Sequence, residues 1–279
     1  MIRKPLQTIT GINTSDGAGV KLVRVIGHRN VYDFDPFLML DAFDSNDPKD
    51  YIKGFPWHPH RGIETVTYLI SGDIQHGDSL GNEGRILDGC CQWMTAGSGI
   101  MHQEMPQPSR KMLGVQLWVN LPAKNKMTSP KYHDIEAKDV PLIKKDDYEV
   151  RVISGSFDNV KSKDNDEFVK TTFLDVLLKP DKPFEIETAP DSTLFLYIVY
   201  GDGYFADLDE LFSSKRAVLF DKGEIFHAKA GKEGIRFLLF NAKPLKEPIS
   251  WGGPIVMNTK EELQKAFDDL SNGTFIKKN

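Results

Sequence analysis

The sequence predicts an all-β protein built from two antiparallel barrels, and three observations carry this prediction. Short segments rich in β-branched and aromatic residues recur along the chain, bounded by Gly, Pro, Asp and Asn. Helical periodicity is scarce until the C-terminal region. A glycine turn followed by a histidine occurs at 97–102 and again at 222–227, which indicates an internal repeat. Many short strands joined by frequent turns are typical of sandwiches and jelly-roll barrels.

Segments in both halves of the chain are expected to form the strands. Each is short, rich in β-branched or aromatic residues, and bounded by turn formers. Ser71-Gly72-Asp73 and Tyr200-Gly201-Asp202-Gly203 are expected to be turns that link consecutive strands. The expected strands are Val20–Val25, Thr65–Ile70, Leu113–Val119, Thr172–Leu178, Leu194–Val199 and Ile235–Phe240.

With 279 residues the chain is long enough for two domains, although length alone also admits one large β-rich domain. The stretch from 129 to 166 is charged, notably at 144–147 and 161–167, and we expect a solvated connection with loops there. We therefore predict an N-terminal domain over 1–134 and a C-terminal domain over 135–279.

The clearest helix lies near the C-terminus. Thr259-Lys260-Glu261-Glu262 matches a capping box, in which the threonine oxygen and the Glu262 carboxylate satisfy free backbone N–H groups. The apolar residues that follow share one helical face, and Gly273 can end the helix. We expect this short helix to pack on a sheet.

Composition excludes several classes of protein. The 40 acidic and 35 basic residues are interspersed and give a net charge of -5, so direct nucleic-acid binding is not expected. No apolar run is long enough to span a bilayer, and no secretory signal is apparent. The adjacent Cys90 and Cys91 are badly placed to bridge each other, which fits a reducing compartment. We expect a soluble cytoplasmic protein, or a nuclear one in a eukaryote.

Two short motifs carry the chemistry. His58-Pro59-His60 and His102-Gln103-Glu104 each place two metal-binding side chains two residues apart, and residues i and i+2 of a strand point to the same face. Three imidazoles and one carboxylate suit iron, and also copper, nickel, manganese or zinc. Four protein ligands leave open positions on a six-coordinate ion, as catalysis requires. Pro59 cannot donate to a ladder and indicates an edge or bulged strand.

Other readings of the polar residues remain open. An isolated His-x-His pair is often a surface or hydrogen-bonded pair, and Glu64 would also face inward if the first strand stays regular. His28 and His133 are interpreted as surface or local hydrogen-bonding residues, and His76 as a turn residue or one at the pocket mouth. Cys90 and Cys91 are interpreted as small buried hydrophobic residues, with a redox-active thiol as the alternative. No Walker, GxSxG or Rossmann motif is present, so no nucleotide cofactor is expected.

The sequence resembles the pirin family of the cupin superfamily over nearly its whole length. Before Gln92-Trp93-Met94, where pirins usually carry a Gly-Asp-Val-like run, this chain has Gly89-Cys90-Cys91. The segments that carry the resemblance are Asp35–Asp41, Phe55–Tyr68, Asp78–Asn82, Gln92–Pro106 and Trp251–Thr259.

The resemblance implies a bicupin: two stacked antiparallel jelly-roll β-barrels, with the metal in the N-terminal barrel alone. Its Fe(II) ligands would be His58, His60, His102 and Glu104, with Glu64 beside the site rather than on the metal. His227 lacks a partner pair in the second half, which fits a metal-free barrel there.

The resemblance also implies function. Some pirins are quercetinases, so the chain is expected to be a flavonol 2,3-dioxygenase that opens the ring with release of carbon monoxide. Glu104 would serve as ligand and as acceptor of the hydroxyl proton. The expected partners are a small aromatic substrate such as a flavonol and O2, and we expect a monomer. The alternatives are an iron-binding, redox-sensitive regulator of a transcription factor or metabolic enzyme, and a metal cupin acting on another small substrate.

Overall fold

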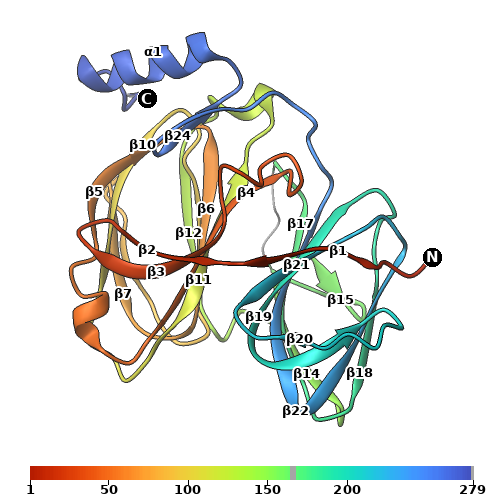
Figure 1. Cartoon of the computed structure of the whole chain (residues 1–279). Coiled ribbons are helices and arrows are strands. Elements are labelled where there is room, and N and C mark those ends of the chain that lie inside the picture. The colour runs from red at the N-terminus through yellow and green to blue at the C-terminus, as the bar shows by residue number, and fades with distance from the viewer. Residues whose placement is uncertain (164–167, 278–279) are drawn as a thin grey trace. The chain divides into compact units, whose positions relative to one another are not determined.

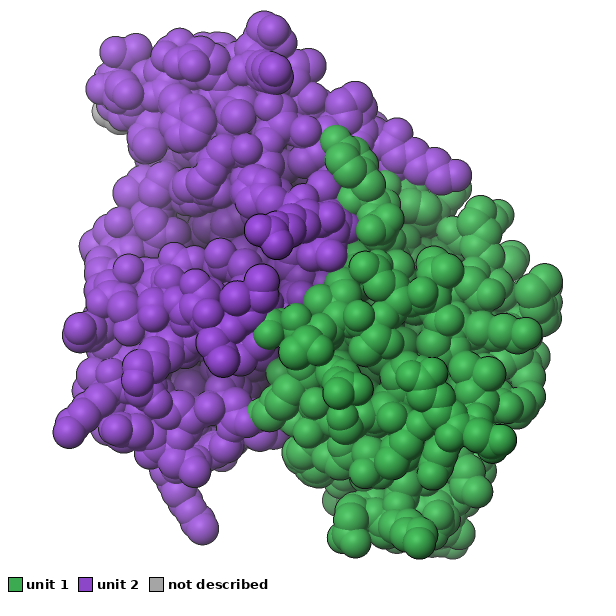
Figure 2. Space-filling model, in the orientation of Figure 1, with its two compact units in different colours: residues 1–11, 32–36, 138–244 green, residues 12–31, 37–137, 245–279 purple. Residues whose placement is uncertain are grey.

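The structure is a computed structural model that describes residues 1–163 and 168–277 (Figure 1). The chain forms two compact units (Figure 2). Unit 1 comprises residues 1–11, 32–36 and 138–244, and unit 2 comprises residues 12–31, 37–137 and 245–279. The units therefore do not coincide with the contiguous ranges 1–134 and 135–279, because each end of the chain joins the unit formed mainly by the other half.

Unit 2 contains two antiparallel sheets and carries the candidate site. The first has the strand order β12-β9-β6-β11-β4-β3-β2 and the second the order β5-β10-β7-β8. The strands of the first are β2 (Ile12–Asp16), β3 (Val20–Ile26), β4 (Phe37–Ser45), β6 (Ile63–Ser71), β9 (Cys91–Thr95), β11 (Met112–Asn120) and β12 (Lys131–Ile135). Those of the second are β5 (Phe55–His60), β7 (Ile74–Asp78), β8 (Glu83–Ile86) and β10 (Ile100–Pro106), and short 3-10 turns occur at Pro48–Asp50 (η1) and Ala123–Asn125 (η2).

The two sheets of unit 2 face each other, since side chains from one contact side chains from the other. Glu104 on β10 accepts a hydrogen bond from Thr67 on β6, and His76 on β7 stacks on Tyr132 on β12. Apolar clusters around Met94 and around Leu69 form the core of this unit. Buried polar residues, among them His60, His102 and Glu104, lie in the same interior, and such a group is unusual there and indicates a site.

Residues 245–279, the C-terminal segment, complete unit 2. They form the hairpin β23 (Ser250–Gly252) and β24 (Ile255–Met257), followed by helix α1 (Lys260–Ser271). The predicted capping box is confirmed, because Glu262 N donates to Thr259 Oγ1 and the Glu262 carboxylate accepts from Thr259 N. The apolar face of α1 packs on the hairpin, as expected, with Leu263 and Ala266 against Ile255.

Unit 1 consists mainly of one nine-stranded antiparallel sheet and has a hydrocarbon interior. Its main path is β1-β21-β19-β22-β17-β14-β13, with β18 added on β22 and β20 on β19, and β15 pairs with β16. Phenylalanines such as Phe184, Phe205 and Phe226 fill the interior. The strands are β1 (Pro5–Thr10), β13 (Leu142–Lys144), β14 (Tyr148–Ser154), β15 (Ser156–Phe157), β16 (Val160–Lys161), β17 (Thr171–Leu178), β18 (Pro183–Glu187), β19 (Thr193–Phe205), β20 (Phe212–Ser213), β21 (Arg216–Phe220) and β22 (Ile225–Ala242).

The all-β prediction with one short C-terminal helix is confirmed, and each of the expected strands lies within an observed one. Neither large sheet closes on itself among the described residues, since β12 and β2 are the edges of one and β1 and β13 the edges of the other. No helix in the described ranges is long and apolar enough to cross a membrane.

Two local predictions are wrong. Tyr200–Gly203 is not a turn: β19 runs through it with a bulge, because Gly201 adopts φ +75° and lets the chain approach Gly234 closely. The charged stretch from 129 to 166 is not mainly loop, since β12, β13 and β14 lie in it. Residues 164–167 of the charged run at 161–167 lie outside the described residues.

Candidate metal centre

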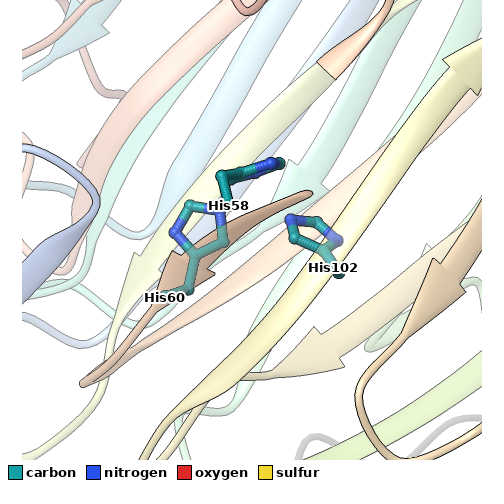
Figure 3. Close-up of side chains that lie close together, drawn as sticks. All are labelled: His58, His60 and His102. Carbon is teal, nitrogen blue, oxygen red and sulfur yellow. The ribbon is translucent and has the colours of Figure 1, made fainter. Parts of the chain in front are cut away.

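Three histidines of unit 2 converge from two neighbouring strands. β5 and β10 pair antiparallel with His58 directly opposite His102, and His60 lies two residues along β5 from His58. Because alternate residues of a strand face the same side, the three rings meet (Figure 3). Their candidate ligand nitrogens all lie within 4.8 Å of one another. β5 is the edge strand of its sheet, which confirms the position predicted from Pro59.

Backbone carbonyls orient two of these rings. His58 Nδ1 lies 2.8 Å from Pro56 O, and His60 Nδ1 lies 3.0 Å from Pro254 O. A carbonyl oxygen can only accept a hydrogen bond, so each Nδ1 carries the proton and each Nε2 keeps its lone pair. Hydrogen bonds of this kind fix the tautomer and orientation of metal-binding histidines.

Burial keeps the inner two imidazoles neutral. Burial, and then the neighbouring His58, lower the pKa of His60 to about 3. Burial, followed by the neighbouring histidines, lowers the pKa of His102 well below its usual value. Neither ring nitrogen of the buried His102 has a hydrogen-bond partner among the described residues. Neutral imidazoles that are buried and unpartnered are suited to a divalent cation, so the residues fit a metal.

Glu104 lies two residues beyond His102 on β10, but its carboxylate is not part of the 4.8 Å histidine group. Instead each of its oxygens accepts a hydrogen bond. Thr67 Oγ1 donates to Oε1 at 2.9 Å, and Gln116 Nε2 donates to Oε2 at 2.7 Å. The structure thus brings together the three predicted histidines and places Glu104 beside them, held by two protein donors.

Glu64 does not share a regular strand with His58 and His60, so that expectation is wrong. β5 ends at His60, and Gly62 adopts φ +78° before β6 begins. A Cβ at Gly62 would lie 2.0 Å from Val256 O, so only glycine fits at this turn of the chain. The buried Glu64 carboxylate accepts a hydrogen bond from Thr95 Oγ1 at 2.7 Å.

The turn position predicted for His76 is wrong. His76 lies within β7, is buried, and stacks on Tyr132 with ring centroids 4.5 Å apart. Its ring centroid is 5.6 Å from that of His102, and its Nε2 is 3.9 Å from Asp78 Oδ2. Burial lowers the pKa of His76.

A cavity of about 520 Å³ in unit 2 opens onto the cluster, with His58 and His60 in its lining. A flavonol-sized molecule needs a pocket of at least about 300 Å³. His28, interpreted from the sequence as a surface or local hydrogen-bonding residue, is exposed and stacks on Trp251 of the C-terminal segment with centroids 3.8 Å apart. The lining residues are Asp16, Gly17, Arg24, Gly27, His28, Met39, Asp41, Phe55, Pro56, His58, His60, Gln116, Trp118, Trp251, Gly253 and Pro254.

Sequence reasoning missed the polar residues that support the site. Gln116 holds Glu104, and Asp41 is buried at 3% exposure within β4. One signal for Asp41 was available, because a carboxylate in the middle of the apolar run Phe37–Phe43 requires a cationic partner. The role of the Pro254 carbonyl could not be predicted in this way, since every residue has a backbone carbonyl.

The other histidines and the cysteines considered in the sequence analysis are not part of the histidine cluster. His227 is on β22 of unit 1, with Nδ1 3.7 Å from Asp207 Oδ1. His133 is on β12, opposite Trp93. Cys90 and Cys91 form no disulfide among the described residues, and Cys91 is buried whereas Cys90 is half-buried, which agrees for Cys91 with the interpretation as a small buried hydrophobic residue.

Comparisons with known proteins give a consistent result. The family model described as Pirin matches residues 19–119, and the model of the pirin C-terminal cupin domain matches 173–276. A pirin-like protein of Caulobacter vibrioides is 40% identical over 98% of this chain and 99% of its own, and human pirin is 36% identical over 97% and 93%. A crystal structure of quercetin 2,3-dioxygenase from Acinetobacter baumannii is 33% identical, covers 99% of both chains and superposes with a TM-score of 0.91.

Proposed function

This chain belongs to the pirin family, and on that premise we propose that it is a metal-dependent dioxygenase of quercetin-like flavonols. The observation that carries the proposal is the cluster of three imidazoles at one side of a cavity with aromatic walls. A similar chain is described as a quercetin 2,3-dioxygenase. The proposed reaction adds both atoms of O2 to the flavonol, opens its central ring and releases carbon monoxide.

His58, His60, His102 and Glu104 would hold the metal, with Fe(II) favoured by this donor set and copper, nickel, manganese or zinc as alternatives. When bound, the ion supplies Lewis acidity and the one-electron chemistry that reaction with O2 requires. Glu104 retains lone pairs beside the two hydrogen bonds that it accepts, so it can contact the ion or take the proton of the flavonol 3-hydroxyl.

The rest of the cavity orients the substrate and excludes water. Thr67 and Gln116 hold the Glu104 carboxylate, and Trp118 Nε1 donates to Gln116 Oε1 at 3.3 Å, which fixes the amide in turn. Trp118, Phe55 and Met39 give the walls apolar area against which a planar ring can stack. A dry, preorganised site strengthens every polar contact made in it.

The test is oxygen uptake by the Fe(II)-loaded protein with quercetin, followed with an oxygen electrode while the absorbance of quercetin is recorded. We expect equal consumption of O2 and quercetin, and an equal amount of carbon monoxide. A protein that retains its metal but consumes neither compound would contradict the proposal.

A further inference from the structure

A row of polar side chains crosses the larger sheet of unit 2. Arg24 on β3 lies opposite Asp41 on β4, Asp41 opposite Gln116 on β11, and Gln116 opposite Thr67 on β6. Residues that lie opposite each other in a sheet point to the same face. Asp41 and Thr67 are 3% and 2% exposed, so the row is part of the interior. Arg24 and Asp41 extend this row beyond the residues that hold Glu104.

The row connects the metal centre with Arg24. At one end, Gln116 and Thr67 donate to Glu104. The backbone of Arg24 stands two strands away from that of Gln116, which is about 10 Å at the usual strand spacing of about 4.8 Å. That separation exceeds one aromatic ring and suits a ligand of linked or fused rings, with one polar end at the metal and another at Arg24.

Arg24 is held in place by two carboxylates, and the N–H groups of its Nη1 remain available. Its Nε and Nη2 donate to the two oxygens of Asp41 at 2.9 and 2.8 Å, and Nη2 also donates to Asp16 Oδ2 at 2.7 Å. Nη1 makes no hydrogen bond within the described ranges of the chain. The guanidinium is therefore fixed by two carboxylates, and it lines the cavity with a donor still available.

The charge at this end of the cavity selects the kind of polar group that fits. One guanidinium stands beside two carboxylates, so the local charge is negative and a carboxylate on the ligand would be repelled. A neutral hydroxyl can accept from Arg24 Nη1 and donate to an oxygen of Asp16 or Asp41. The stacked pair His28 and Trp251 adds an aromatic wall to the same cavity.

We propose that Arg24 determines the specificity of this cavity by binding a neutral phenolic hydroxyl on a ring remote from the metal-binding group. Asp16 and Asp41 accept from that hydroxyl and disfavour aromatic acids. The inference rests on the proposed function only in that the ligand is a flavonol-like aromatic molecule. We expect the cavity to bind flavonols that carry hydroxyls on their outer rings more tightly than flavonols that lack them.

Binding to Zn(II)-loaded protein tests this without turnover. The probes are quercetin, which carries hydroxyls on both outer rings, 3-hydroxyflavone, which has the same metal-binding group and no other hydroxyl, and 3-hydroxyflavones with a carboxylate on either outer ring. Quenching of tryptophan fluorescence reports binding, since Trp118 and Trp251 line the cavity. A hydrogen bond to a charged group gives about a tenfold or greater preference for quercetin over 3-hydroxyflavone, and the acids are expected to bind more weakly than either.

The variant is Arg24→Gln with Asp41→Asn, so that no buried carboxylate loses its counter-charge. We expect its preference for quercetin over 3-hydroxyflavone to fall about tenfold, because the remote hydroxyl of quercetin loses its partner whereas 3-hydroxyflavone has no such hydroxyl. Arg24→Lys is a milder variant that keeps the positive charge. Its preference for quercetin over 3-hydroxyflavone should lie between those of the wild type and the double variant. The matched control is Arg85→Gln with Asp73→Asn, because Arg85 also donates through Nε and Nη2 to both oxygens of an aspartate, but lies on β8 away from this cavity.

The two proposals fail in different measurements. If quercetin is oxidised but its preference over 3-hydroxyflavone is the same in wild type, Arg24 variants and the Arg85 control, the role of Arg24 is refuted and the dioxygenase remains. If the preference depends on Arg24 but no oxygen is consumed, the dioxygenase is refuted and the role of Arg24 remains. Tighter binding of the acids, or no binding of either flavonol, overturns the inference.

Discussion

Asp269→Asn tests how strongly the C-terminal segment is tied to the candidate metal centre. Arg61 follows His60 directly, is 1% exposed, and donates from Nη1 to Asp269 Oδ2 on α1 at 2.9 Å. Its Nη2 donates to Phe275 O at 3.0 Å, and its guanidinium lies 4.2 Å from the centroid of the Phe275 ring. Removing the charge of Asp269 leaves a buried guanidinium with neutral contacts alone.

Breaking one side of a buried ion pair costs about 3 to 5 kcal/mol. Because Arg61 keeps both contacts with Phe275, we expect the lower end, a loss of about 3 kcal/mol in the free energy of unfolding. That corresponds to a fall of about 6 to 12 °C in Tm for a unit of this size. Arg61, with Lys277 and Lys265, lowers the pKa of Asp269 below its usual value. The stabilisation is therefore complete above the unfolded pKa and disappears only as pH falls through the lowered one, so the difference should be constant from about pH 5 to 8.

The assay is thermal unfolding of metal-free protein, followed by circular dichroism at about pH 5 and pH 8, the two ends of that range. Asp191→Asn is the matched control, because Asp191 pairs with Lys222 on the exposed surface, at 79% and 73% side-chain exposure. Exposed pairs of this kind stabilise little. Equal changes in Tm for the two variants would refute the account of Arg61 and Asp269.

Three further predictions concern the candidate metal centre. His102→Ala should lose most of the metal measured by elemental analysis, whereas His133→Ala on β12 should retain it, and equal contents would exclude His102 as a ligand. Gly62→Ala should yield little folded protein, because its Cβ would lie 2.0 Å from Val256 O at φ +78°; a soluble variant with wild-type Tm would contradict this. The pKa of His60 is about 3 in the folded protein, against 6.5 for an ordinary histidine, so the unfolded chain binds more protons between these values. Metal-free protein should thus lose about 1.4 kcal/mol per pH unit from His60 on acidification below about pH 6.5, and His60→Asn should have a shallower dependence of stability on pH in urea titrations.

The sequence predicts those parts of the fold and site that depend on local pattern. The strands follow from runs such as Leu113–Val119, and helix α1 follows from its capping box and apolar face. His58, His60 and His102 were found because i and i+2 spacing in a strand fixes a common face without knowledge of the tertiary fold.

The rest depends on contacts between residues that are distant in the sequence. Pro254 orients His60 from 194 positions away, and the pairing of Trp251 with His28 is equally non-local. The assumption that β5 runs on to Glu64 failed because Gly62 turns the chain, and a glycine in an extended run does not reveal which φ it adopts. The burial of His76 depends on Tyr132 of another strand, so its own neighbours in the sequence could not indicate it.

The dependence of His60 on Pro254 also sets an order of events during protein synthesis. The ribosome makes His60 194 residues before Pro254, and at about 5 to 20 residues per second that interval is about 10 to 40 s. Until the C-terminal segment is made, the strands of the histidine cluster lack the carbonyl that orients one ring, Trp251, and Asp269, the counter-charge of Arg61. Metal loading is therefore expected to follow translation of the C-terminal segment rather than to accompany emergence of the histidines.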